Sequence, residues 1–143
     1  GECRGEETLD MLQAMNTGHD GSMTTVHANS PQDVISRLDS LVLMGNIDLP
    51  LRAIREQIAS AIDLIVHTAR FLDGTRKVTR FTEVTGMDAN ADITFGDLFV
   101  FQQHGVGPKG EVLGAFKPTG HRPTFLEELR AKGFPLDEAM FRP

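Results

Sequence analysis

Residues 1–29 read GECRGEETLDMLQAMNTGHDGSMTTVHAN, and this stretch decides how the whole chain is interpreted. It places several acids, the histidines His19 and His27, and a run of hydroxyl side chains in one short segment. Side chains of these kinds polarise water, move protons and hydrogen-bond to anions. Because the polar cluster starts at residue 1, we expect the chain to begin inside a functional site rather than ahead of one.

The rest of the first half contains both helical and extended patterns. Apolar residues at helical spacing predict a helix over residues 8–16. Ser30, followed by a proline, is typical of a helix start, and Pro50 opens a third helix. The hydroxyl-rich residues 22–27 predict a strand, and the apolar run 64–66 predicts a buried one.

The second half has the character of an antiparallel sheet. Strands are predicted over residues 78–84, 93–102 and 111–116. Clusters of turn residues separate them by short connections, which favour hairpins. A last helix is predicted from Thr124, because Thr124 and Glu127 have the spacing of a capping box.

Composition limits the classes of function. At 143 residues, the chain can form one domain with a modest core. Its net charge of -6 gives no indication of nucleic-acid binding. The single cysteine, Cys3, cannot form an internal disulfide. No apolar run approaches the roughly 18 residues of a membrane-spanning helix, so no direct insertion into a membrane is expected.

Several long motifs carry a resemblance to a known family. They are residues 1–5 (GECRG), 9–19 (LDMLQAMNTGH), 25–29 (TVHAN), 49–66 and 97–101 (DLFVF). The chain closely resembles the Walker B and His-box region of the secretion ATPase superfamily, the motors of type II secretion, type IV pili and type IV secretion. Its pattern is most similar to the branch that drives Tad/Flp pilus assembly, the CpaF-like ATPases.

The resemblance implies an α/β fold, namely the C-terminal half of a RecA-like P-loop NTPase domain with an antiparallel β appendage and a C-terminal helix. Residues 1–72 would belong to the ATPase domain, and residues 73–143 would form the antiparallel strands and the last helix. The family's phosphate loop, Gly-x-x-x-x-Gly-Lys-Ser/Thr, does not occur in the chain. Since that loop precedes Walker B in the family, we expect a partial ATPase that is inactive alone.

The resemblance assigns catalytic roles to Glu2 and His27. Glu2 matches the family's catalytic glutamate, a carboxylate that polarises the water attacking ATP. The alternative for Glu2 is a frayed acid at the start of the chain. His19 and His27 match the His box, which implies contact with the γ-phosphate side of the site. Of the two, His27 is the stronger candidate, because it ends a predicted strand.

Arg4, Glu7, His19 and Thr25 are the predicted nucleotide-binding residues. Three of them have a simpler alternative. Arg4 can form a structural ion pair with a neighbouring glutamate. Glu7 can be an acid at a helix N-terminus, and Thr25 can reflect β propensity alone.

The resemblance also implies ATP and Mg2+ as cofactors, a homo-hexamer, and the inner-membrane platform proteins of a pilus or secretion machine as partners. Such a motor is cytoplasmic and peripheral to the inner membrane. Because the phosphate loop is absent, a non-catalytic assembly or docking module is the alternative. A zinc site built from Glu2, Cys3, His19 and His27 is a further alternative, but their spacing fits no zinc signature.

Overall fold

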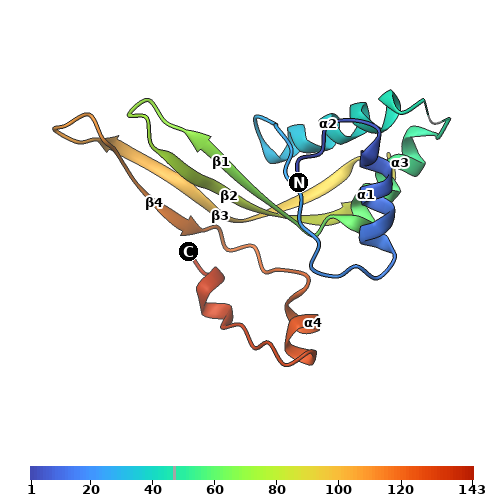
Figure 1. Ribbon diagram of the computed structural model, residues 1–143. Coiled ribbons are helices and arrows are strands. Elements are labelled where there is room, and N and C mark those ends of the chain that lie inside the picture. The colour runs from blue at the N-terminus through green and yellow to red at the C-terminus, as the bar shows by residue number, and fades with distance from the viewer. Residues whose placement is uncertain (47) are drawn as a thin grey trace. The chain divides into compact units, whose positions relative to one another are not determined.

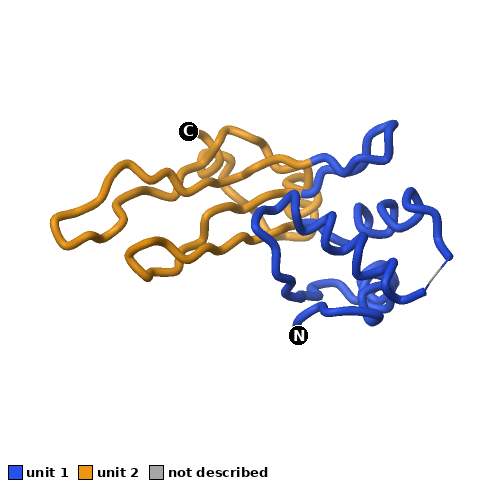
Figure 2. The backbone as a smooth tube through the Cα atoms, turned by 90° about the horizontal axis from the view of Figure 1, so that it is seen from above, with its two compact units in different colours: residues 1–63, 84–94 blue, residues 64–83, 95–143 orange. Residues whose placement is uncertain are grey.

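The computed structural model describes residues 1–46 and 48–143, and Figure 1 shows its helices and strands. The elements are α1 (Glu7–Asn16), α2 (Pro31–Met44), α3 (Leu51–Ala61), β1 (Leu64–Arg70), β2 (Arg76–Met87), β3 (Ile93–Val106), β4 (Val112–Pro118), α4 (Leu126–Ala131) and the 3-10 helix η1 (Glu138–Phe141). The chain divides into two compact units (Figure 2). The first comprises Gly1–Asp63 and Val84–Thr94, and the second comprises Leu64–Glu83 and Phe95–Pro143.

Helices α1, α2 and α3 pack against one another in the first unit. The start of α2 is set by Ser30, whose hydroxyl accepts the Asp33 N–H at 3.1 Å. The helices bury one apolar stripe each, with side chains that are at most 2% exposed: Leu12, Leu38, Leu41, Val42, Ile54 and Ile58. Burying each leucine or isoleucine side chain contributes about 1.5–3 kcal/mol to stability. The apolar stripes therefore hold the unit together.

A partly buried ion pair joins two of these helices. Arg55 of α3 donates to Asp39 Oδ2 of α2, and the Nη2–Oδ2 distance is 3.2 Å. Nη1 of Arg55 also donates to the Ala91 carbonyl and to Asp92 Oδ1, each at 3.0 Å. Arg55 therefore connects α2 and α3 to the turn between β2 and β3, which belongs to the same unit.

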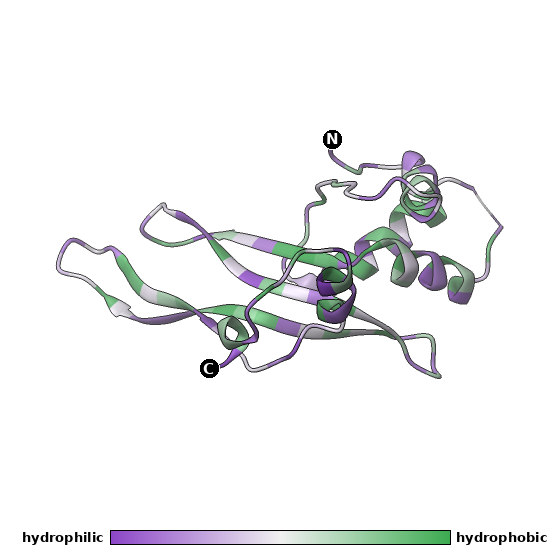
Figure 3. Ribbon diagram, turned by 90° about the horizontal axis from the view of Figure 1, so that it is seen from below, coloured by the Kyte–Doolittle hydropathy of each residue, from purple (hydrophilic) through white to green (hydrophobic). Residues whose placement is uncertain are grey.

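The four strands form a sheet in the order β1-β2-β3-β4. The β1–β2 and β3–β4 pairs are antiparallel, with Ile65 opposite Thr82 and Phe101 opposite Phe116. Hydrophobic and hydrophilic residues follow one another along the strands, as a half-buried sheet requires (Figure 3). The hairpin turns account for the order, because short turns join sequence neighbours.

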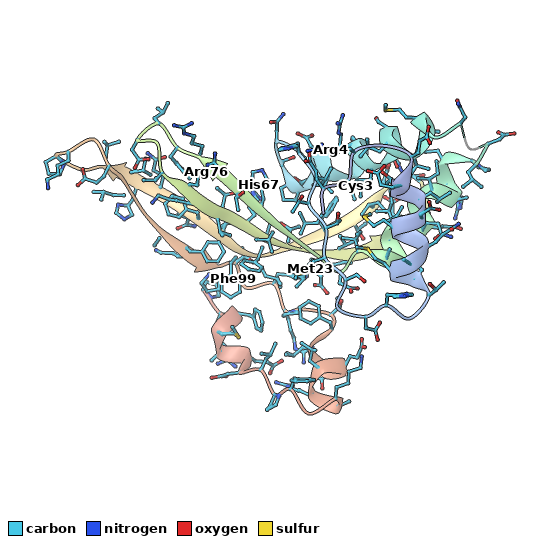
Figure 4. All side chains as sticks on the ribbon, in the orientation of Figure 1. Cys3, Arg4, Met23, His67, Arg76 and Phe99 are labelled. Carbon is cyan, nitrogen blue, oxygen red and sulfur yellow. The ribbon has the colours of Figure 1, made fainter. Side chains whose placement is uncertain are left out.

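The C-terminal segment packs on the sheet within the second unit. Leu98 of β3, Leu126 of α4 and Phe141 of η1 are buried together, each at most 5% exposed. Phe99, labelled in Figure 4, stacks on Phe116 with ring centroids 5.6 Å apart and also contacts the Phe141 ring. Contacts between aromatic rings therefore attach η1 to β3.

Most of the predicted elements are present. The helix over residues 8–16 is α1, and the helices expected at Ser30 and Pro50 are α2 and α3. The strands of the second half are β2, β3 and β4, each longer than predicted. The strand at residues 64–66 is the start of β1, but only Ile65 of those three side chains is buried.

Two local predictions were wrong. Residues 22–27 do not form a strand, because Thr25 makes one isolated parallel bridge with Glu2 and Met23 is 90% exposed, with no ladder to continue. Thr124 does not cap the last helix, which begins at Leu126. The Thr124 hydroxyl donates instead to Glu83, a partner 41 residues earlier in the chain.

The coarse fold is confirmed as mixed α/β with an antiparallel sheet. The finer assignment, half of a RecA-like domain over residues 1–72 with an appendage over 73–143, stays a prediction. Among the described residues, no helix is both long and apolar enough to cross a bilayer.

Candidate functional site

Three predicted site residues meet around one carboxylate. Arg4 donates from Nε and Nη2 to Oε2 of Glu2, at 2.9 and 2.7 Å. His27 places Nε2 2.9 Å from the other oxygen, Oε1. The two side chains form an ion pair at this distance when the His27 ring is protonated. The Glu2 carboxylate is thus held from two sides by side chains from separate segments.

The backbone brings these segments together. The Cys3 N–H donates to the Thr25 carbonyl at 2.8 Å, and the Thr25 N–H donates to the Gly1 carbonyl at 3.3 Å. The Thr24 hydroxyl adds a third bond, to the Gly1 carbonyl at 2.7 Å. These bonds form the bridge that sets Glu2 beside Thr25, and His27 follows two residues later on the same side of an extended segment.

The charge of Glu2 is stabilised by its neighbours. The hydrogen bond from Arg4 is the largest cause of a lowered Glu2 pKa, against a smaller opposing effect of burial. The charges of Arg4, His27 and Arg37 lower this pKa further. Glu2 raises the pKa of Arg4 in return. At neutral pH the group is therefore a carboxylate paired with a guanidinium.

Glu7 accepts backbone hydrogen bonds just before the start of α1. Its Oε1 accepts the N–H groups of Arg4 at 2.7 Å and Gly5 at 3.2 Å. These backbone bonds, that of Arg4 first, hold the Glu7 pKa below its usual value. Glu7 therefore fixes the loop that carries Arg4, in agreement with the simpler alternative of an acid at a helix N-terminus. Its role in nucleotide binding stays a prediction.

Cys3 is part of the core rather than of the charged cluster (Figure 4). Its Sγ lies 2.9 Å from the Thr8 hydroxyl, which itself donates to the Gly5 carbonyl at 2.7 Å. Because the Thr8 hydrogen is used there, the thiol is the donor to Thr8. In the described part of the chain, no three metal-binding side chains gather, and the zinc alternative gains no support.

His19 and Thr25 are placed differently from the other predicted residues. Nδ1 of His19 donates to the Ala14 carbonyl at 3.0 Å, so this histidine closes the end of α1. Thr25 is exposed and contributes its backbone to the bridge with Glu2. The structure thus joins Glu2, Arg4 and His27, sets Glu7 behind Arg4, and does not add His19 to this group.

Two hollows lie beside the group formed by Glu2, Arg4 and His27. A hollow of about 450 Å³ is lined by Glu2, Glu7 and apolar residues of α1 such as Met11 and Met15. A second pocket, of about 290 Å³, is lined by His27, Ala28, Asn29, Asp33, Ser36, Arg37 and Ser40. Sequence reasoning missed this second pocket. The signal for it was the row of polar residues opposite the apolar stripe of α2.

The family of the chain follows from comparison with known proteins. Residues 1–105 match the Type II/IV secretion system protein family, and the chain belongs to this family. A protein of Mycobacterium tuberculosis strain H37Rv, provisionally named for conjugal transfer, is 42% identical over 78 residues, which are 54% of this chain and 22% of that protein. VirB11 of the Brucella abortus type IV secretion system is 36% identical over 77 residues, 52% of this chain and 21% of that protein.

One solved structure is also similar. The crystal structure of the VirB11 ATPase from the Brucella suis type IV secretion system, in complex with sulphate, has 34% identity and a TM-score of 0.52. The match covers 57% of this chain and 25% of that one. The aligned regions thus span about a quarter or less of these relatives. The predicted secretion ATPase family is confirmed, and the Tad/Flp branch remains a prediction.

Proposed function

We propose that this chain is part of a hexameric ATPase that hydrolyses ATP to power pilus assembly, of the Tad/Flp type, or protein secretion across the inner membrane. Its partners would be the inner-membrane platform proteins of that machine, reached from the cytoplasmic side. The observation that carries the proposal is the Glu2 carboxylate held between Arg4 and His27 at 2.7–2.9 Å. This group lies inside the region that matches the family.

In this proposal Glu2 orients the attacking water. Phosphoryl transfer is promoted mainly by positioning and by stabilisation of charge, so a carboxylate that accepts a hydrogen bond from water suffices. Glu2 suits this role because its lowered pKa keeps it ionised and its side chain is still a quarter exposed. Water can therefore reach the oxygens that Arg4 and His27 leave partly free.

In this proposal, binding of the substrate phosphate changes how Arg4 and His27 pair with Glu2. A terminal phosphate is a stronger hydrogen-bond acceptor for a guanidinium than an exposed carboxylate, because it offers more oxygens and more charge. The Arg4 and His27 side chains are 77% and 89% exposed, so they can turn from Glu2 to such a group. Glu2 would then lose its partners and become a better acceptor of the water proton.

The fit to the implied cofactors is partial. Glu2, Arg4 and His27 suit the phosphate end of a nucleotide, and in the described part of the chain no three metal-binding side chains gather around a Mg2+ position. Proteins commonly hold Mg2+ with one or two carboxylates while substrate phosphates and water complete its shell. The phosphate-loop pattern does not occur in the 143 residues, so nucleotide binding is proposed for a motor that contains such a loop.

The test measures Mg2+-dependent ATP hydrolysis on two matched samples, this chain and a longer product that includes a phosphate loop. We expect activity in the longer product alone and a loss of about 100-fold or more on Glu2→Gln, since a water-orienting base contributes at least that much. No activity in either sample would favour the non-catalytic docking module. Activity in this chain alone would refute the Walker-type interpretation of the site.

A further inference from the structure

The outward face of α2 forms one wall of the 290 Å³ pocket, and the proposed chemistry leaves this wall unused. Ser36, Arg37 and Ser40 come from α2, and Asn29 comes from the loop before it. Arg37 and Asn29 carry N–H donors and Ser36 carries an O–H donor, whereas the Ser40 hydroxyl donates to the Ser36 carbonyl at 3.0 Å. His27 lines the same pocket, so the pocket adjoins the Glu2 group within the first unit.

Helical spacing explains why the donors share a face. Ser36 and Ser40 are four residues apart, and Arg37 precedes Ser40 by three, so their side chains are neighbours on the helix surface. The apolar stripe of α2, with Leu38 and Leu41, is buried on the other side. Packing of that stripe leaves Ser36, Arg37 and Ser40 exposed to solvent.

The positive charge of Arg37 is available to a ligand. Arg37 is exposed, and no salt bridge of this residue is found among the described residues. Its charge is nevertheless among the causes that lower the pKa of Glu2. The guanidinium thus lies within electrostatic range of the proposed catalytic carboxylate while its own donors are free of an acid.

We propose that Arg37, with Ser36 and Asn29, forms an oxyanion subsite beside His27 that binds a phosphate group. A guanidinium can bind two phosphate oxygens at once, and the hydroxyl and amide donors match the remaining one. The choice of phosphate rests on the proposed function. The group would be the terminal phosphate of a nucleotide or the phosphate released from it. His27 would contact both Glu2 and this subsite.

Asp33 allows a test of whether charge governs phosphate binding in this pocket. Its carboxylate lines the same pocket and repels an anion, while its backbone N–H is already bonded to Ser30. Asp33→Asn keeps the size of the side chain and removes the charge. This variant should bind phosphate more tightly, whereas Arg37→Gln should bind it more weakly.

The experiment titrates the isotopically labelled 143-residue chain with inorganic phosphate, against sodium chloride of equal ionic strength. NMR follows the Arg37 Nε–Hε group, the Asn29 side-chain amide and the His27 ring. We expect saturable shifts at all three with phosphate, and about tenfold weaker binding in Arg37→Gln, the size of one charge-assisted hydrogen bond. Arg52→Gln is the matched control, because Arg52 is an exposed arginine of the same unit that does not line the pocket.

Three outcomes would overturn the subsite. They are shifts that follow ionic strength alone, equal binding by the Arg37→Gln and Arg52→Gln variants, and weaker binding by Asp33→Asn. A parallel titration with ATP separates the two sources of the phosphate group, since a product subsite responds to free phosphate and a substrate subsite responds to ATP alone. This readout needs no hydrolysis. Absence of hydrolysis in the longer product would refute the proposed function without altering these titrations, and a failure of Glu2→Gln to reduce activity would refute only the role of Glu2.

Discussion

At the scale of the residue, the ionisation of Glu2 depends on Arg4. Because Arg4 is the first cause of the lowered Glu2 pKa, Arg4→Gln should raise that pKa towards the usual value for glutamate. The direction of this pKa shift also determines how the stability of the chain depends on pH. The pairing favours the folded chain above the usual glutamate pKa and is lost as pH falls through the lowered one. A carbon-detected NMR titration of the Glu2 carboxyl measures the shift, and an unchanged value would contradict the Arg4–Glu2 bond.

Asp39 and Arg55 should respond unequally to substitution. Burial raises the pKa of Asp39 despite the nearby Arg55, and Oδ1 of Asp39 has no hydrogen-bond partner among the described residues. Arg55→Gln leaves this carboxylate without its cation and should destabilise the chain by about 3 kcal/mol. Asp39→Asn removes the buried charge and keeps an acceptor for Arg55, so its cost should be below about 1 kcal/mol.

Urea denaturation at pH 7 measures both variants. A raised pKa means that the favourable contribution of Asp39 is present at low pH and is lost as pH rises through the folded-state value. The gap between wild type and Asp39→Asn should therefore move in favour of the variant as pH rises. Equal costs for the two substitutions would contradict the dominance of burial.

At the scale of the element, Glu83 attaches the segment before α4 to β2. Glu83 is 1% exposed. It accepts the Thr124 N–H at 2.9 Å and the Thr124 hydroxyl on Oε1, and it lies 2.8 Å from Nε2 of His121 through Oε2. Glu83→Gln replaces one acceptor with a donor and should cost about 1–3 kcal/mol, the penalty of an unsatisfied buried group. Glu138→Gln, on an exposed surface pair, should change the free energy of unfolding far less.

Gly96 is required by the same attachment. A Cβ atom at Gly96 would lie 2.3 Å from Nε2 of His121, closer than two atoms can approach. Gly96→Ala should therefore displace the His121 ring from Glu83 and destabilise the chain by about 1–3 kcal/mol. Amide exchange at Thr124 measures the local loss. Gly105→Ala is the control in the same strand, because a Cβ there meets nothing within 4 Å, and equal effects of the two substitutions would refute the steric argument.

The sequence predicts features that depend on neighbouring residues better than features that depend on residues distant in the chain. The hairpin turn at Asp73 was predictable because its determinants are local, with Gly74 at φ 84° and the Asp73 carboxylate bonded to the Thr75 N–H at 2.9 Å. The role of Thr124 was not, because its partner Glu83 is distant in sequence. The candidate site divides in the same way. Glu2 and His27 came from a motif, whereas the Arg37 pocket depends on how α2 lies against the loop before it.

At the scale of the whole molecule, the free edges of the sheet favour self-association. In the strand order of the described residues, β1 and β4 are the outer strands. Each carries exposed apolar side chains, such as Val66 at 50% and Leu113 at 40%. Unpaired edge strands of this kind pair with other chains, and lysine on an edge prevents it. Val66→Lys and Leu113→Lys should therefore lower the average mass of the chain in solution, as measured by light scattering over a concentration series.

Leu72→Lys distinguishes pairing of strand edges from non-specific association through exposed apolar surface. Leu72 is fully exposed in the turn after β1, so this control adds the same charge and removes a more exposed leucine without touching an outer strand. If strand edges drive association, Leu72→Lys should leave the average mass near that of the wild type, while the two edge variants shift it towards the 15.7 kDa monomer. Equal solubilisation by all three would assign the association to exposed apolar area. A wild-type chain that is monomeric at every concentration would contradict both explanations.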